Sequence, residues 1–304
     1  MTRNHSISSV FALASLPLAC AAITLGASHH VDHLISALRD LASLLSTSSM
    51  NGVGPMTGMA IVVVLFLAGV VSGLSGFAFA AVAALVLWLL PPLQAVPLIM
   101  LLSTCNQLLS IAKLRHEITL IGSAEREGAL PYILGGLTGA PLGVAMLCGL
   151  PAIWFAAGLG LFLVAYSIFM LALPGRARIT LSGWRPAAIV GAVGGVIGGF
   201  SGFGSSAIVV YLGLRGADKS SVRGITQPYI VAMQVVSLGV LAALDPAIFN
   251  AMFWLLWVVT LPAVMLGTNT GVALYRRLSD VNFRRAVLVL LAISGTSLLF
   301  KALV

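Results

Sequence analysis

Long stretches without any charged residue are the feature that most constrains this chain. No Asp, Glu, Lys or Arg occurs in residues 41–112, 128–175, 186–214, 224–244, 246–275 and 286–300. A helix that crosses a bilayer needs about 20 mostly apolar residues, so most of these stretches can cross at least once. Only 8% of the residues are charged, against about 25% in soluble proteins. The sequence therefore predicts an all-α, multi-pass protein of the plasma membrane, here a bacterial inner membrane, with the lipid bilayer as its constant partner.

The first 50 residues differ from the rest. Residues 1–30 carry Arg3 before an apolar run, which fits either a membrane anchor or a cleaved signal peptide. Residues 31–50 start with apolar side chains at helical spacing and with Asp32, Arg39 and Asp40 on other faces. This pattern predicts an amphipathic helix on the membrane surface, followed by a linker.

The remaining sequence contains two related halves, residues 51–175 and 176–304. Three motifs recur in the same order at an offset of 126 to 128 residues. The pairs begin at Gly69 and Gly195 (GVVSGLSGF and GVIGGFSGF), at Gln107 and Gln234 (QLLS and QVVS), and at Gly139 and Gly267 (GAPLGVA and GTNTGVA). We assign the GxxxG spacing of the third pair to close helix packing. The order and spacing of the three pairs predict two transmembrane repeats.

The positions of basic residues orient these repeats. Lys and Arg collect in cytoplasmic loops, which places residues 113–126 and 276–285 inside and residues 149–151 outside. Equivalent loops of the two halves then fall on opposite sides, so the repeats are expected to be inverted, as in many secondary transporters. Each half should hold a Gly/Ser-interrupted helical hairpin plus three spanning helices. The expected spans are residues 94–112, 129–148, 152–173, 223–243, 247–274 and 284–303.

The interrupted hairpins are the expected binding elements. Glycine and serine runs at residues 72–76 and 198–206 predict helix breaks, and broken backbone at membrane depth must be buried or line a polar cavity. A helix that starts at such a break points its free N–H groups at an anion. The candidate substrate-binding residues are Ser75, Gly76, Gln107, Ser201, Gly202, Ser205, Ser206 and Gln234. Packing by small residues and hydrogen bonding between helices are the alternative roles.

Charged residues give a second set of expectations. Arg215 and Arg223 are placed at a cytoplasmic anion vestibule, and main-chain N–H groups are expected to supply most of the attraction deeper in. No carboxylate lies within a predicted span, so we expect no carboxylate-based proton relay. The net charge of +8 is attributed to the positive-inside bias, and no nucleic-acid partner is expected. No metal site and no cofactor are predicted.

An enzymatic alternative rests on GLSG and GFSG at Ser75 and Ser201, which match the GxSG nucleophile motif of intramembrane serine proteases. A serine nucleophile needs a general base within hydrogen-bond reach. The only histidine after the N-terminal region is His116, in a charged loop. The sequence therefore favours a protein without catalytic residues.

The same residues resemble the TauE/SafE family of sulfite exporters. The resemblance rests on GGVIGGFSGFG at residues 194–204, YLGLRG at 211–216 with Lys219 and Arg223, and SGFAFA at 75–80 followed by LPP at 90–92. It covers about residues 56–303 and implies export of sulfite, sulfonates or related small organic and sulfur oxyanions. The chain departs from the family pattern at Ala78 and at Ser205 and Ser206. An anion channel and an assembly protein remain alternatives.

Overall fold

The computed structural model describes residues 55–113, 118–122, 128–172, 179–275 and 280–303. The chain divides into two compact units, Met1–Gly58 and Met59–Val304, and nearly all described residues belong to the second. The predictions for residues 1–30 and 31–50 fall outside the described residues.

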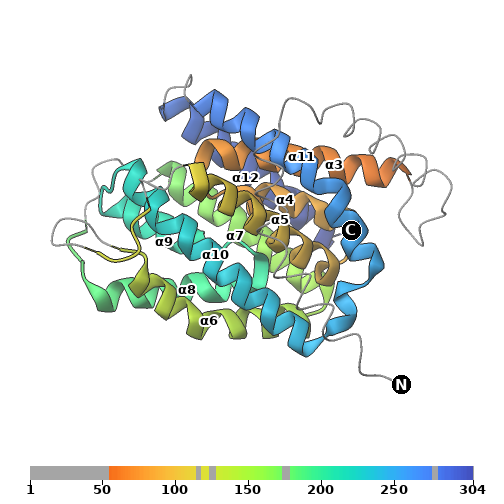
Figure 1. The fold of residues 1–304 in the computed structure, drawn as a ribbon, viewed down its shortest axis with the longest axis horizontal. Helices are drawn as coiled ribbons and strands as arrows, with labels where there is room; N and C mark the ends of the chain where they lie inside the picture. The colour runs from red at the N-terminus through yellow and green to blue at the C-terminus, as the bar shows by residue number, and fades with distance from the viewer. Residues whose placement is uncertain (1–54, 114–117, 123–127, 173–178, 276–279, 304) are drawn as a thin grey trace. The chain divides into compact units, whose positions relative to one another are not determined.

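Every regular element in the described residues is a helix (Figure 1), as predicted for the fold class. The elements are α3 (Pro55–Ser75), α4 (Phe79–Ala83), η1 (Ala84–Trp88), α5 (Pro92–Lys113), α6 (Leu130–Gly149), α7 (Ala152–Ala172), α8 (Trp184–Ser201), α9 (Ser205–Leu214), α10 (Lys219–Leu244), η2 (Pro246–Phe249), α11 (Ala251–Tyr275) and α12 (Asp280–Leu303). Here η1 and η2 are short 3₁₀ helices.

Six of the described helices are long and apolar enough to cross a membrane: α3, α5, α6, α7, α10 and α11. Helix α3 differs from expectation, because its segment was predicted to be part of an interrupted hairpin and not one of the spanning helices. Its apolar run continues without interruption from Met56 to Ser75, which is 20 residues and enough for a full span. Helix α12 occupies the last predicted span, and its apolar part runs from Leu288 to Leu303.

Two helix pairs pack backbone against backbone through glycines. In the α6–α8 pair, a Cβ built on Gly139 or on Gly143 would lie only 2.1 Å from a carbonyl oxygen of α8. In the α3–α11 pair, a Cβ on Gly267 would lie 2.3 Å, and one on Gly271 2.1 Å, from a carbonyl oxygen of α3. Real Cβ atoms do not approach so closely, so only glycine fits, and the assignment of both GxxxG motifs to packing is confirmed.

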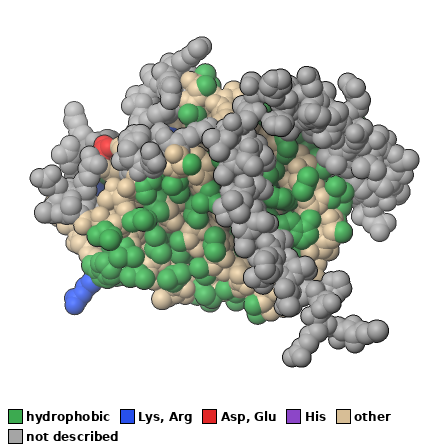
Figure 2. All heavy atoms as spheres, viewed as in Figure 1, with side chains coloured by type: hydrophobic (Ala, Val, Ile, Leu, Met, Phe, Trp, Pro, Cys, Tyr) green, Lys and Arg blue, Asp and Glu red, His purple; other side chains and the backbone are tan. Residues whose placement is uncertain are grey.

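Large apolar side chains cover much of the outside of the described helices. Leu142, Leu161 and Ile189 are more than half exposed, at 58%, 62% and 66%, and Figure 2 shows apolar side chains over the described part of the visible face. A soluble protein rarely exposes apolar patches of this extent. In a bilayer these side chains meet lipid, and polar side chains gather inside the bundle instead.

Candidate functional site

Two helices stop at matching breaks inside the bundle. Helix α3 ends at Ser75, just before Gly76, whose φ is +82°. Helix α8 ends at Ser201, and its C-cap Gly202 has a φ of +78°. This left-handed conformation is the usual way in which glycine ends a helix. The glycine N–H groups donate to Ser72 and Gly198 carbonyls at 2.6 and 2.7 Å. We call the Ser75–Gly76 turn the first break and the Ser201–Gly202 turn the second break.

The serine side chains at both breaks form hydrogen bonds with main-chain groups. The Ser75 hydroxyl donates to the Val71 carbonyl at 2.9 Å and accepts from the N–H groups of Phe77 and Ala78, at 3.3 and 3.0 Å. The Ser201 hydroxyl donates to the Ile197 carbonyl at 2.8 Å and accepts from Phe203 N–H at 3.3 Å. The sequence predicted these hydroxyls as donors to a substrate. In the structure, each of the two hydroxyls instead donates its proton to a main-chain carbonyl.

The two breaks lie against each other. Phe77 and Phe203, each two residues after the serine, stack with ring centroids 6.5 Å apart and planes 11° apart. A Cβ built on Gly202 would lie 3.6 Å from the Cβ of Ala80. The interrupted elements of the two halves therefore meet, which is the juxtaposition on which the predicted site depends.

Polar side chains from two helices hold the first break. Gln107 of α5 donates its Nε2 to the Gly76 carbonyl at 3.0 Å. Asn106 donates to the Ser72 hydroxyl at 2.6 Å and accepts from Thr268 of α11 at 2.7 Å. These amides lock the broken backbone to its neighbours, because main-chain groups that leave a helix need other partners.

A buried arginine completes these surroundings. Arg223 of α10 is only 7% exposed and donates its Nη2 to the Leu74 carbonyl at 3.1 Å. A Cβ built on Gly76 would lie 2.7 Å from Arg223 Nε, so the guanidinium lies directly on the first break. Sequence reasoning placed Arg223 at an outer vestibule and expected no cation beside the breaks. The structure brings this positive charge to one of them.

The second break has apolar neighbours instead. A Cβ built on Gly202 would contact Met100 Cγ at 3.5 Å and Ile99 Cγ2 at 3.8 Å, both from α5. Ser206, also a predicted site residue, donates its hydroxyl to the Phe203 carbonyl at 2.9 Å. The same glycine-terminated helix end therefore has charged and polar neighbours at the first break and apolar neighbours at the second.

Several buried polar atoms have no hydrogen-bond partner in the described structure. They are Gln107 Oε1, Ser205 Oγ, Gln227 Oε1, Gln234 Nε2 and Ser237 Oγ, among others. Ser205 is the first residue of α9 and is 1% exposed. The predicted residue Gln234 accepts from Thr104 at 3.1 Å through its other amide atom. Buried polar atoms without partners are uncommon in native proteins, so these atoms are candidates for contact with a polar ligand or water.

Gln227 is not among the eight predicted substrate-binding residues, although it is a polar residue within a predicted span, four positions after Arg223 on one helix. Arg215 follows α9, and its guanidinium lies 5.4 Å from the centre of the Tyr211 ring. Arg215 is partly exposed, whereas Arg223 is buried. In the part of the chain that the structure describes, no group of three or more His, Cys, Asp or Glu side chains could hold a metal ion.

Comparison with known proteins gives one match. The sequence model for the family described as sulfite exporter TauE/SafE matches residues 61–298, from within α3 to within α12. Neither a curated protein nor a solved structure matches the chain. The family consists of membrane transporters and not of enzymes, which removes the protease alternative. The chain therefore belongs to the TauE/SafE sulfite exporter family and is a multi-pass membrane transporter of a small solute.

Proposed function

We propose that this transporter exports a small oxyanion of the sulfite or sulfonate class across the bacterial inner membrane. The anion binds where the two breaks meet, on the side of the first break. The observation that carries this proposal is Arg223, whose buried guanidinium lies against Gly76. A guanidinium offers several N–H donors in a planar fork that suits the oxygens of an oxyanion.

Other groups would complete the site. The unpartnered hydroxyl of Ser205 is buried, and Ser205 opens α9, where main-chain N–H groups and the helix dipole favour an anion. The Gln227 amide carries its own N–H donors on the helix that bears Arg223. These groups would bind the anion by hydrogen bonds, whereas Arg223 supplies the charge.

We also propose that the halves are inverted repeats, each contributing one break. The support is a reciprocal pattern of packing. Helix α3 of residues 51–175 packs on α11 of residues 176–304, and α8 of the second half packs on α6 of the first. In the motif alignment α3 corresponds to α8 and α6 to α11, so the same contact is made twice with the halves exchanged. Substrate sites at the interface of such repeats are common in secondary transporters.

Voltage is the proposed driving force. Asp218 and Asp245, the acidic side chains that the structure describes, are both exposed, and no described carboxylate is available inside the bundle for a proton relay. An anion that leaves a cell with a negative interior gains about 2.3 kcal/mol per charge per 100 mV. This is enough to drive export without a proton.

The test measures sulfite flux in proteoliposomes of the purified protein, with the voltage set by a potassium gradient and valinomycin. We expect flux that saturates with sulfite and follows the voltage at equal pH on both sides. Flux that rises without saturation would favour the channel alternative. Flux that requires a pH gradient at zero voltage would contradict the proposed driving force.

The site is tested in the same assay with Arg223→Gln. Loss of a charged hydrogen bond, worth about 1.5–3 kcal/mol, should weaken apparent sulfite affinity about 10- to 100-fold. Arg223→Lys keeps the charge but loses the planar fork, and should retain part of the affinity. Arg215→Gln should have a smaller effect that fades at high salt, because an outer charge is screened. A folded Arg223→Gln protein with unchanged affinity would place the site elsewhere.

A further inference from the structure

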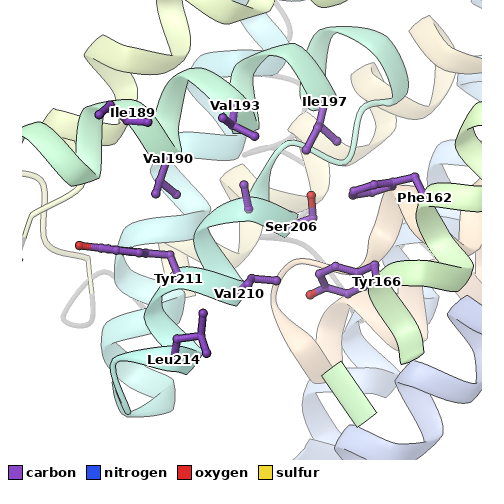
Figure 3. A pocket seen from close by; sticks show the side chains of 11 residues that line it. Phe162, Tyr166, Ile189, Val190, Val193, Ile197, Ser206, Val210, Tyr211 and Leu214 are labelled. Atoms are coloured by element: carbon purple, nitrogen blue, oxygen red, sulfur yellow. The ribbon is translucent and has the colours of Figure 1, made fainter. Parts of the chain in front are cut away.

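An apolar groove of about 340 Å³ lies between α7, α8 and α9 (Figure 3). Phe162 and Tyr166 of α7 line one side, and the remaining walls come from residues 189–197 of α8 and 206–214 of α9. The α8 wall is open to the outside, since Ile189 is 66% and Val193 50% exposed. In a membrane transporter such an opening faces lipid, so the groove is accessible to bilayer components.

The two ends of the groove differ. Ile189 and Tyr211 lie toward one side of the groove, and Ile197 and Ser206 lie toward the other (Figure 3). The Ser206 end adjoins the second break, because the Ser206 hydroxyl bonds the Phe203 carbonyl. Phe203 also contacts the rings of the groove residues Tyr166 and Phe162, at centroid distances of 5.6 and 6.4 Å. The inner end therefore rests on the aromatic cluster that joins the breaks.

The opposite end is cationic. Arg215 lies over Tyr211, a groove residue, at 5.4 Å from the ring centre. Arg185 lies in the first turn of α8 and is exposed, next to the exposed Trp184. Tryptophan and arginine at a helix end are typical of the membrane–water interface. An apolar groove with positive charge at one end matches one acyl chain of a lipid with an anionic head.

We propose that the groove binds an acyl chain of an anionic phospholipid, with the phosphate at Arg185 and Arg215. Eight residue steps along α8, from Ile189 to Ile197, correspond to about 12 Å of helix, which lies within one leaflet of a hydrocarbon core of about 30 Å. The chain fills the open side of α9, a helix of 10 residues that is too short to cross the membrane alone. Bound lipid thereby stabilises the element that begins at the second break, a role separate from anion transport.

The test uses phosphatidylglycerol with a photoactivatable group on its acyl chain, in vesicles that contain the intact protein. We expect cross-links concentrated on α8 and α9. Val193→Trp, which fills the groove, should reduce them several-fold, and Leu142→Trp, at an equally lipid-facing site of α6 that is 58% exposed, should leave them unchanged. Cross-links spread evenly over all exposed helices would show ordinary annular lipid and would overturn the proposal.

Lipid selectivity is measured first on the unmodified protein, and this first measurement does not depend on the folding of a variant. Native mass spectrometry should show retained phosphatidylglycerol in preference to phosphatidylcholine. Arg185→Gln and Arg215→Gln should each lower this preference about fivefold, since a basic residue near the surface contributes about one kcal/mol toward anionic lipid. Equal retention of both lipids would exclude a role for the arginines. Because the readout is lipid binding, it is independent of whether sulfite is the transported anion.

Discussion

The first and second breaks have the same main-chain conformation but very different neighbouring side chains. Both end a helix with a glycine of φ near +80° and a serine that caps the turn. The first break meets Arg223 and Gln107, whereas the second meets Met100 and Ile99. At the offset of 127 that relates Gln107 to Gln234, Ile99 and Met100 are the counterparts of Thr226 and Gln227. The broken helix is therefore common to both halves, and Arg223 of α10 together with Gln107 of α5 gives the first break its polar character.

Substitution of the two glycines should separate these roles most strongly. Alanine at either position adds strain of about 1–2 kcal/mol, because an L-residue is unfavourable at positive φ. At Gly76 the new Cβ would also displace Arg223, 2.7 Å away, whereas at Gly202 the nearest neighbour is at 3.5 Å. Gly76→Ala should weaken apparent sulfite affinity at least about tenfold through loss of a charged hydrogen bond.

Gly202→Ala should lower the melting temperature in detergent but keep affinity within about twofold, since its added methyl reaches only ordinary van der Waals contacts. Thermal unfolding and liposome flux of the two purified variants check both statements. Equal losses of affinity would mean that the breaks contribute equally to the site.

The paired glutamines offer a smaller contrast. Gln107→Leu removes the bond to the Gly76 carbonyl and leaves a buried acceptor without its donor, which should destabilise the protein by about 1–3 kcal/mol. Gln234→Leu should have a weaker effect, because its partner Thr104 also donates to the Met100 carbonyl at 2.8 Å. Thermal unfolding of the two variants in the same detergent measures the difference. A larger loss for Gln234→Leu would reverse the assignment of the anchoring role.

The capping serines should differ only slightly. Ser75→Ala and Ser201→Ala each remove a neutral hydrogen-bonding group worth about 0.5–1.5 kcal/mol. Ser75 should lie at the upper end, because it accepts from two main-chain N–H groups and Ser201 from one. The measurement is again thermal stability, with transport as a control. A complete loss of flux in a stable Ser201→Ala protein would return that hydroxyl to the substrate site.

The smallest effect concerns how α10, the helix of Arg223, begins. Asp218 caps it by accepting from the N–H groups of Ser220 and Ser221, at 3.0 and 3.2 Å, whereas the residue before α5 is Pro91, whose side chain has no oxygen to accept such a bond. A hydrogen bond from the Ser221 side chain lowers the pKa of the Asp218 carboxyl below its usual 3.8. Asp218→Ala should cost about 0.5 kcal/mol, the low end for an exposed N-cap.

The sign of the pH effect follows from the lowered pKa. The stabilisation by ionised Asp218 is fully present above about pH 4 and is lost as the pH falls through its folded value. Asp218→Asn keeps a capping oxygen and should keep most of the stability at neutral pH. Thermal unfolding against pH would contradict this account if both variants lost stability equally at neutral pH.

Local signals in the sequence predicted much of the fold. Apolar stretches located the helices, and the repeated glycine–serine motif located both breaks, because helix ends and positive φ leave a strong mark on composition. The length of α3 was missed. Its segment was assigned to an interrupted hairpin and not to a span, but the apolar run before Ser75 is long enough to cross the membrane by itself.

The depth of Arg223 could not be predicted for a different reason. A charged residue beside an apolar stretch normally marks a loop, so the helix was expected to start at residue 223. Asp218 caps α10 so that it starts at Lys219, which places Arg223 in its second turn. The direction of its long side chain then depends on packing against the first break, a contact across 149 positions of sequence. The sequence also did not predict that the Ser75 and Ser201 hydroxyls donate to main-chain carbonyls, because these bonds depend on the local geometry of the breaks.

The glycine contacts within the α6–α8 and α3–α11 pairs limit which parts of the transporter can move. Where α6 meets α8 and α3 meets α11, main chain touches main chain, and not even a methyl group would fit between them. Contacts of this kind contain no flexible side chains that could rearrange to absorb sliding. We therefore expect each pair to move as one rigid body that joins the two sequence halves. A movement that opens the proposed site to one side and then the other would rotate each pair as a whole, with the deformation concentrated at the two breaks.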